Sequence, residues 1–321
     1  MAKVTRLGYQ IPNFTYPDTT AAELFPAIVA QAVEAENSGF DTVLVMDHFY
    51  QLPLLGEPDE PMIECYTLLA ALAQHTSRVR LSALVTGNTY RHPTLLAKEV
   101  TALDVVSGGR AQLGIGAGWF ELEHDSLGYD FGTFTDRFEK LEEALRIIIP
   151  MLRGERPSLG GQWYQVSEAI NSPPPLSSIP VMIGGGGERK TLRMVAQYAN
   201  ESNIICAPNE IGRKFGALDA HCERLGRDRS EITVSLQTSV CLAPTHEEAV
   251  AELEAYLVRN PRAAVRRDSM IVGAPDEVAE QYAGLLGAGI DGFTVNALAN
   301  GHVPGRVSLL GETLAPLLTA N

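Results

Sequence analysis

Residues 179–192 read Ile179-Pro180-Val181-Met182-Ile183-Gly184-Gly185-Gly186-Gly187-Glu188-Arg189-Lys190-Thr191-Leu192. The apolar run predicts a strand over residues 181–183, and the residues after the glycines predict a helix over 188–198. Glycines lack a Cβ atom and let backbone N–H groups approach an anion, while the first turn of the next helix adds unpaired donors. The order strand, glycines, helix predicts a phosphate-binding loop, with an ordinary tight strand-to-helix connection as the alternative.

The rest of the chain alternates strands and helices. Seven further strands are expected over residues 6–10, 42–46, 79–86, 111–116, 202–206, 233–242 and 292–296. Further helices are expected over 21–38, 63–76, 93–106, 135–153, 209–225, 275–286 and 309–318, and from residue 245. Such alternation implies parallel pairing with right-handed crossovers. Eight strands predict an α/β fold of the (β/α)8 TIM barrel type rather than a doubly wound sheet.

No linker or low-complexity segment divides the chain. We therefore expect a single TIM-barrel domain over residues 1–321. Insertion segments are expected at about 50–62, 155–178 and 258–273, at the mouth formed by the carboxyl ends of the strands, and the second contains a small hairpin. Chemistry in such barrels lies at this mouth, so the residues after each strand are the candidates for a site.

The composition limits the classes of function. The chain has a formal net charge of −14, with 45% hydrophobic and 20% charged residues, which is typical of a globular protein with a large core. Its negative field opposes binding to nucleic acid and anionic membranes. The sequence has no apolar run of ~18 residues and no signal-peptide core, so we expect a cytoplasmic protein. The four cysteines have no metal-site or disulfide spacing, and we expect no bound metal.

Polar residues and glycines follow three expected strands. Asp47 and His48 follow the strand over 42–46, and an imidazole beside a carboxylate can bond a cofactor ring or handle a proton near neutral pH. Thr86 and Asn88 follow the next strand, where a hydroxyl and an amide can bond a polar ring edge. A glycine-rich segment over 114–118 then lets backbone approach a ligand. Loop hydrogen bonds, a bare turn and tight barrel packing are the alternatives.

These segments together resemble a known family. The sequences VMDHF (45–49), VTGNTYRHP (85–93), GIGAGW (114–119) and GGGGER (184–189) occur in the same order and at the same strand ends as in the luciferase-like monooxygenase superfamily of flavin- and deazaflavin-dependent oxidoreductases. They look most like the branch that uses coenzyme F420. The resemblance runs from Gly8 to the terminal helix.

The resemblance implies roles for individual residues. Asp47 and His48 are the implied catalytic residues at the cofactor ring, with His48 in proton transfer. The implied cofactor-binding residues are Asp47, Ala83, Leu84, Thr86, Asn88, Ala117, Gly118, Gly184, Gly185, Gly186, Gly187 and Glu188. A non-prolyl cis peptide is implied near Ala83-Leu84. The superfamily's sugar-phosphate dehydrogenases carry a Glu where this chain has Trp119, which argues against that activity.

The resulting prediction is an oxidoreductase that transfers a hydride between coenzyme F420 and an unidentified organic small molecule. One alternative is a monooxygenase that uses reduced FMN and O₂. Another is a non-catalytic flavin- or deazaflavin-binding protein, since a binding fold alone does not confer turnover. A cofactor-free sugar-phosphate barrel is disfavoured because no Schiff-base lysine stands at an expected strand end. We also expect a homodimer.

Residues 259–267, RNPRAAVRR, gather four arginines in an otherwise acidic chain. The segment follows the strand over 233–242, so it is expected at the mouth of the barrel. Guanidinium groups bind anionic oxygens with two-pronged hydrogen bonds, which suggests a lid over an anionic ligand. A solvated helix face is the alternative.

Overall fold

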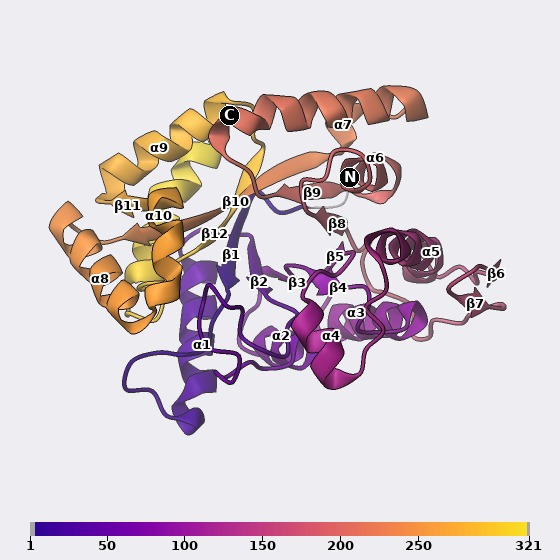
Figure 1. Ribbon diagram of the computed structural model, residues 1–321, viewed down its shortest axis with the longest axis horizontal. Helices are drawn as coiled ribbons and strands as arrows, with labels where there is room; N and C mark the ends of the chain where they lie inside the picture. The colour runs from indigo at the N-terminus through magenta and orange to yellow at the C-terminus, as the bar shows by residue number, and fades with distance from the viewer. Residues whose placement is uncertain (1–3, 320–321) are drawn as a thin grey trace.

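A computed structural model describes residues 4–319. Its centre is a closed barrel of parallel strands, which confirms the predicted (β/α)8 fold (Figure 1). The barrel strands are β1 (Leu7–Ile11), β2 (Thr42–Val45), β3 (Arg80–Ala83), β5 (Ala111–Gly116), β8 (Val181–Gly184), β9 (Glu201–Ile204), β10 (Thr233–Leu242) and β12 (Gly292–Asn296). Each barrel strand pairs in parallel with the next one in this order, including β10, which bonds β9 on one side and β12 on the other. The pairing of β12 with β1 completes the ring.

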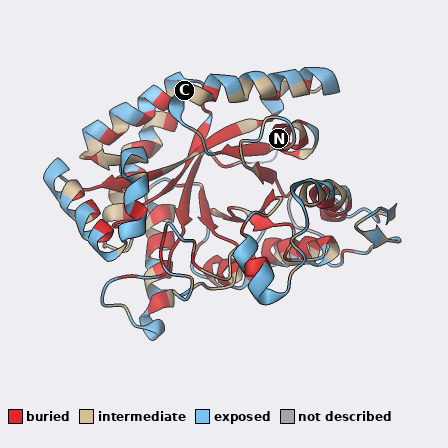
Figure 2. Cartoon of the chain, in the orientation of Figure 1, coloured by how far each residue is buried: buried red, intermediate tan, exposed pale blue. Residues whose placement is uncertain are grey.

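The strands are buried because both of their faces are covered. Every residue of β1, β2, β5 and β12 is buried, as expected for parallel strands with helices outside and packed side chains inside. Figure 2 shows this arrangement, with buried strands at the centre and exposed outer helix faces. The barrel is therefore a packed core whose carboxyl ends are available for a site.

Helices surround the barrel. They are α1 (Ala21–Asn37), α2 (Cys65–Ala73), α3 (Pro93–Ser107), α5 (Phe134–Leu152), α6 (Thr191–Tyr198), α7 (Ile211–Leu225), α8 (His246–Arg259), α9 (Pro275–Gly287) and α10 (Arg306–Thr319). Local signals set their ends: α3 starts with Pro93, whose missing N–H costs nothing there, and stops at Gly108 in the left-handed region. Among residues 4–319, no helix is long and apolar enough to cross a membrane.

The insertion segments contain structure of their own. The hairpin expected near residues 160–166 is confirmed as β6 (Leu159–Gly160) and β7 (Gln165–Val166). The last segment forms the 3-10 helix η3 (Pro261–Ser269) and a strand, β11 (Met270–Gly273), which pairs with β10 outside the ring. Two short 3-10 turns, η1 (Pro208–Glu210) and η2 (Arg229–Glu231), flank α7.

At the mouth, the structure differs from the sequence-based prediction in three places. The strand expected over 79–86 is two strands, β3 and β4 (Thr86–Gly87), with Leu84 and Val85 between them. The helix expected from Glu188 begins at Thr191, because three residues after the glycines form a turn. A short helix, α4 (Glu121–Leu127), was not expected at all. All three changes affect the site.

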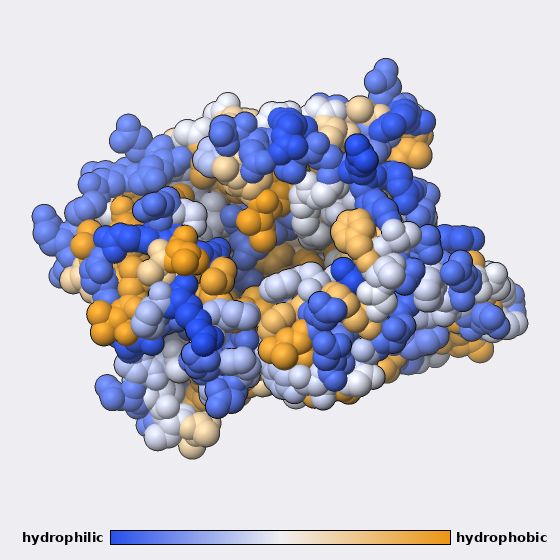
Figure 3. All heavy atoms as spheres, in the orientation of Figure 1, coloured by the Kyte–Doolittle hydropathy of each residue, from blue (hydrophilic) through white to orange (hydrophobic). Residues whose placement is uncertain are grey.

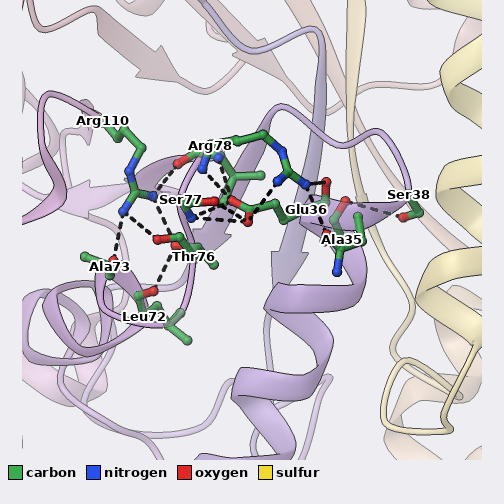
Figure 4. A network of polar contacts seen from close by, with 11 residues as sticks. Ala35, Glu36, Ser38, Leu72, Ala73, Thr76, Ser77, Arg78 and Arg110 are labelled. Atoms are coloured by element: carbon green, nitrogen blue, oxygen red, sulfur yellow. Dashed lines mark hydrogen bonds and ion pairs between the residues drawn. The ribbon is translucent and has the colours of Figure 1, made fainter.

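The bottom of the barrel is held by charged groups bonded to backbone (Figure 4). The Glu36 carboxylate, at the end of α1, accepts the N–H groups of Ser77 (2.8 Å), Arg78 (2.6 Å) and Val79 (3.0 Å). Arg110 donates to the Val79 carbonyl at 2.8 Å. Burial opposes ionisation of Glu36, but these hydrogen bonds lower its pKa. The network ties α1 to the loop that leads into β3.

A second glutamate lies inside the bottom of the barrel. Glu201 is fully buried; its Oε2 accepts the N–H of Thr5 (3.1 Å) and the amide of Gln112 (2.8 Å). Its Oε1 accepts the Ser235 hydroxyl at 2.8 Å. Burial raises the pKa of Glu201 to about 7. This carboxyl is therefore largely protonated below neutral pH.

Candidate active site

A cavity of about 860 Å³ opens at the carboxyl ends of the strands. It is visible as the hollow near the centre of Figure 3, with apolar side chains around it. Its walls come from the loops after β2, β3, β5 and β8 and from α5 and η3. Polar groups from β1, β10 and β12 also line it, among them Gln10, Gln237 and Asn296. The cavity thus lies where the fold predicts chemistry.

The loop after β2 places His48 in the cavity wall. Its ring contacts Trp119 and Phe120 edge-on, with centroids 5.8 Å and 5.7 Å away. Nδ1 of His48 lies 2.9 Å from Oε2 of Glu123, a fully buried residue of α4. The Tyr90 hydroxyl also donates to Glu123. A carboxylate on one ring nitrogen orients the imidazole with its other edge available to a ligand.

Asp47 also lines the cavity, but its carboxylate is already bonded. Oδ2 accepts the guanidinium of Arg91 at 2.7 Å and the Gly87 N–H at 3.2 Å. Arg91 also pairs with Glu64 (2.6 Å) and Glu99 (3.0 Å). Against the effect of burial, the carboxylate of Asp47, and after it that of Glu99, raises the pKa of Arg91. We therefore assign Asp47 to holding the loops after β2 and β3 together. Both of these bonds are made by Oδ2, and the catalytic role of Asp47 stays a prediction.

The glycines after β8 form an open backbone surface on the cavity. Gly185 has φ +113, a conformation that favours glycine. A Cβ on Gly184 would lie 2.8 Å from Val85, and one on Gly187 would lie 2.9 Å from the Thr191 hydroxyl. Side chains at these two positions would collide with Val85 and Thr191, so glycine is needed there for the loop to pack against its own neighbours.

The loop after β3 forms another wall. A non-prolyl cis peptide joins Leu84 and Val85, one residue later than the implied Ala83-Leu84. Thr86 lines the cavity, and its hydroxyl lies 2.7 Å from that of Tyr66. Ala117 and Gly118, after β5, face the same space.

Most predicted site residues meet in this cavity. Those in its wall are Asp47, His48, Leu84, Thr86, Ala117, Gly118 and Gly184, Gly185, Gly186 and Gly187. Three predicted cofactor contacts lie elsewhere. Ala83 packs in the main hydrophobic core, Asn88 is buried near Tyr164, and Glu188 pairs with Lys214 and Arg213.

Two residues of the site were missed by sequence reasoning. Glu123 belongs to the run ELEHD, which has the charge pattern of a solvated helix face. Arg137 lies in α5, where a charged residue in an amphipathic helix is ordinarily exposed. It lines the cavity, donates to the Gly118 carbonyl at 3.1 Å and stacks over Phe131 at 3.8 Å. Neither position has a sequence signal that distinguishes it from surface charge.

The arginine-rich segment divides between the cavity and the surface. Arg266 lines the cavity, with Nη2 3.5 Å from the Ser239 hydroxyl. Arg262 pairs with Glu57 at 2.9 Å, and Arg267 pairs with Glu254 on the outside. Arg262 and Arg267 therefore belong to the solvated surface. Arg266 lies in the cavity wall, as the predicted lid over a ligand requires.

The donor set of the cavity suits an organic anion. Within residues 4–319, no cluster of three or more His, Cys, Asp or Glu side chains could hold a metal ion. The cavity instead combines glycine backbone, the guanidinium of Arg137 and an imidazole. Backbone N–H groups and a guanidinium fit a phosphodiester.

Comparisons with known proteins agree with this geometry. A family model described as luciferase-like monooxygenase matches residues 5–271. The F420-dependent glucose-6-phosphate dehydrogenase of Microbacterium testaceum (strain StLB037) is 29% identical over 251 residues, which cover 77% of this chain and 72% of that protein.

Two solved structures have the same fold over nearly the whole chain. The coenzyme F420-dependent tetrahydromethanopterin reductase of Methanopyrus kandleri superposes with a TM-score of 0.78 at 19% identity, covering 97% of this chain and 99% of that one. An F420-dependent secondary alcohol dehydrogenase, in complex with an F420-acetone adduct, gives 0.81 at 18% identity, covering 98% and 99%.

Proposed function

Because the chain belongs to the luciferase-like monooxygenase family, we propose that it is an oxidoreductase that transfers a hydride between coenzyme F420 and an organic substrate. The F420 dependence of the Microbacterium relative supports this cofactor. The observation that carries the proposal is that His48 and glycines 184–187 line one cavity. Such a reaction needs a loop that binds the cofactor's phosphate and a group that handles a proton.

The residues present fit the cofactor. Glycines 184–187 would hold the phosphodiester with the backbone N–H groups of Gly186 and Gly187 as donors, because the N–H of Gly185 already donates to the Asn203 carbonyl at 2.9 Å. Arg137, which has no ion pair in the described part of the chain, would add charge beside it. Thr86, Ala117 and Gly118 would border the ring. The bound deazaflavin supplies a carbon that accepts or gives a hydride.

The protein's own groups bind, orient and exclude water. His48 would exchange a proton with the substrate at its cavity-facing edge. The Asp47–Arg91 pair keeps the loops after β2 and β3 in register, so the walls stay fixed. Apolar side chains such as Leu54, Trp119 and Phe138 narrow the entrance and limit access of water.

These walls also support a substrate other than a sugar phosphate. Trp119 stands where the superfamily's sugar-phosphate dehydrogenases carry a Glu, and it is 61% exposed at the cavity. Leu52, Leu54 and Leu55 line another wall. An aromatic and aliphatic lining favours a substrate with an apolar body and few polar groups.

An anaerobic screen tests the proposed function. The protein is incubated with oxidised F420 and a panel of alcohols, with glucose 6-phosphate as a comparison, and loss of the absorbance of the oxidised deazaflavin is followed. We expect turnover with an apolar alcohol and little with the sugar phosphate. A parallel aerobic assay with reduced FMN tests the alternative: turnover that occurs only there, with consumption of O₂, would instead establish the monooxygenase.

We further propose that the protein is a cytoplasmic homodimer. Its four cysteines are free thiols, as expected in a reducing compartment. On α3, Leu95 and Val106 leave 50% and 49% of their surface exposed, which supports a second copy packing on this helix. Light scattering at micromolar concentration should give twice the chain mass, and a monomer mass would reject the dimer.

A further inference from the structure

Glu123 is the most completely bonded acid at the mouth of the barrel. Its side chain is fully buried on α4 and does not line the cavity. Oε2 contacts Nδ1 of His48 at 2.9 Å and accepts the Tyr90 hydroxyl. Oε1 accepts the backbone N–H groups of Phe49 (2.5 Å) and Tyr50 (2.8 Å). Both carboxylate oxygens are thus surrounded by partners.

These partners decide where the hydrogens are. The two backbone N–H groups can only donate, and burial and the bond to Glu123 raise the pKa of Tyr90, so its hydroxyl keeps its proton. Burial opposes ionisation of Glu123, but the bonds from His48, Tyr90 and Tyr50 lower its pKa. An ionised carboxylate has no hydrogen to donate, so the hydrogen between Glu123 and His48 belongs to Nδ1.

A neutral imidazole with its hydrogen on Nδ1 has an unprotonated Nε2. His48 lines the cavity, and within residues 4–319 its one hydrogen bond is the contact at Nδ1. Trp119 and Phe120 pack against the ring and limit its rotation. The ring therefore presents a proton acceptor to the ligand in the cavity.

We propose that Glu123 is a positioning residue that holds His48 in the Nδ1–H tautomer and stabilises the imidazolium formed when Nε2 takes a proton. This proposal rests on the proposed function, and it narrows the substrate to one with a hydroxyl on the carbon that loses the hydride. The product is then a carbonyl compound.

The atoms and electrons of this step balance. The substrate O–H bond breaks, its proton goes to Nε2, and its electron pair forms the second bond of the carbonyl group. The C–H bond on the same carbon breaks, and its hydrogen leaves with both electrons to the oxidised deazaflavin. Glu123 then faces the imidazolium, so the new positive charge has a partner in a buried site. The reverse direction uses the same groups.

A purely structural role for Glu123 makes a different prediction. In that case the carboxylate would tie α4 to residues 49–50, and its loss would change stability without a specific effect on proton transfer. The charged and titratable groups around His48 are Glu123 from α4, Tyr90, whose hydroxyl bonds Glu123, and the adjacent Asp47 with its partner Arg91. Of these, Glu123 is the one bonded to the imidazole.

Nitrogen NMR of histidine-labelled wild-type protein tests the tautomer without cofactor or substrate. The His48 signals are identified by their absence in His48→Ala. Above the titration of the ring, we expect a protonated Nδ1 and a bare Nε2. A His48 that carries its hydrogen on Nε2 would overturn the proposal, whatever the enzyme's cofactor.

Kinetics of Glu123→Gln give the second test, because the amide places an N–H toward Nδ1 and favours the opposite tautomer. With F420 and the best alcohol of the screen, kcat should fall about 100- to 1,000-fold. F420 affinity should stay within about twofold, because Glu123 does not line the cavity.

Tyr90→Phe is the matched control. It removes one donor from Glu123 but keeps the contact between the carboxylate and His48, so kcat should fall less than about tenfold. Equal losses in the two variants, or an unchanged kcat in folded Glu123→Gln, would overturn the proposal. If the wild type oxidises no alcohol with F420, the proposed function fails, while the NMR experiment still decides the tautomer.

Discussion

The mouth and the bottom of the barrel each bury a glutamate, but the pKa values of the two carboxyls are shifted in opposite directions. Glu123 at the mouth accepts two backbone N–H groups and a hydroxyl and faces His48, and its pKa is lowered. Glu201 at the bottom accepts one backbone N–H, one amide and one hydroxyl, and burial raises its pKa to about 7. Both side chains are fully buried. Burial opposes ionisation of both carboxyls; at Glu123 the hydrogen bonds outweigh this effect, whereas at Glu201 they do not.

The opposite pKa shifts suit different roles at the two ends of the barrel. At the mouth, a permanent anion beside an imidazole suits proton exchange with a ligand. At the bottom, a carboxyl that loses its proton near neutral pH makes folding depend on pH. Glu36, also at the bottom, is kept ionised by three backbone N–H groups, which supports the same rule.

The largest effect is expected at the mouth. His48→Ala should lower kcat about 100- to 10,000-fold, the range expected for losing a general acid–base group. F420 affinity should change much less, because the glycine loop and Arg137 remain. Steady-state kinetics and a separate cofactor titration measure the two quantities. Equal losses of turnover and affinity would show that His48 serves binding instead.

The bottom should respond to Glu201→Gln with a gain in stability that depends on pH. The unfolded carboxyl releases its proton near pH 4.3, whereas the folded one holds it to about 7. Wild-type stability therefore falls as pH rises through this window, at a total cost of up to about 4 kcal/mol. Chemical denaturation should find the variant more stable at pH 8 and nearly unchanged at pH 4.

Glu123→Gln should lower the stability of the folded protein, whereas Glu201→Gln should raise it. Because the pKa of Glu123 is lowered in the folded state, its carboxylate stabilises the fold at any pH above the pKa of the unfolded chain. This contribution is lost as the pH falls through the folded pKa. The variant should therefore be less stable than wild type at pH 7. The same sign for both variants would contradict the assignment of charge at the two ends.

A smaller effect is expected at the loop of glycines 184–187, the proposed phosphate site. Gly185→Val places a branched side chain at φ +113, where glycine is favoured, and puts atoms between ligand and backbone. F420 affinity should fall about tenfold or more. Gly154→Val is the control, because Gly154 also has positive φ (+76) but does not line the cavity. Similar affinities for both variants would reject the loop as the phosphate site.

The smallest effect concerns the arginine segment. Arg266→Gln should weaken F420 binding a few-fold, more at low salt, because its guanidinium lies in the cavity wall. Arg267→Gln should have no effect, since Arg267 pairs with Glu254 outside. Titrations of the two variants at two salt concentrations compare them directly. Equal affinities at low salt would place Arg266 with the surface residues.

The sequence predicts the barrel and the backbone of the site better than its charges. Glycines 184–187 and the positions after β2, β3 and β5 follow from strand order, because parallel strands end at one mouth. Glu123 could not be predicted, since its helix interrupts the β5 to α5 connection and its burial arises from contacts with residues 33 to 75 positions away. The identity of Asp47's partner, Arg91, is likewise a product of tertiary structure.

The most direct test of the central claim is a binding titration with F420 and FMN side by side. We expect saturable one-to-one binding of F420, tighter than that of FMN, and weakened by Gly185→Val but not by Gly154→Val. Tighter binding of FMN, or no binding of F420 to the folded protein, would contradict the claim that the cavity is a deazaflavin site.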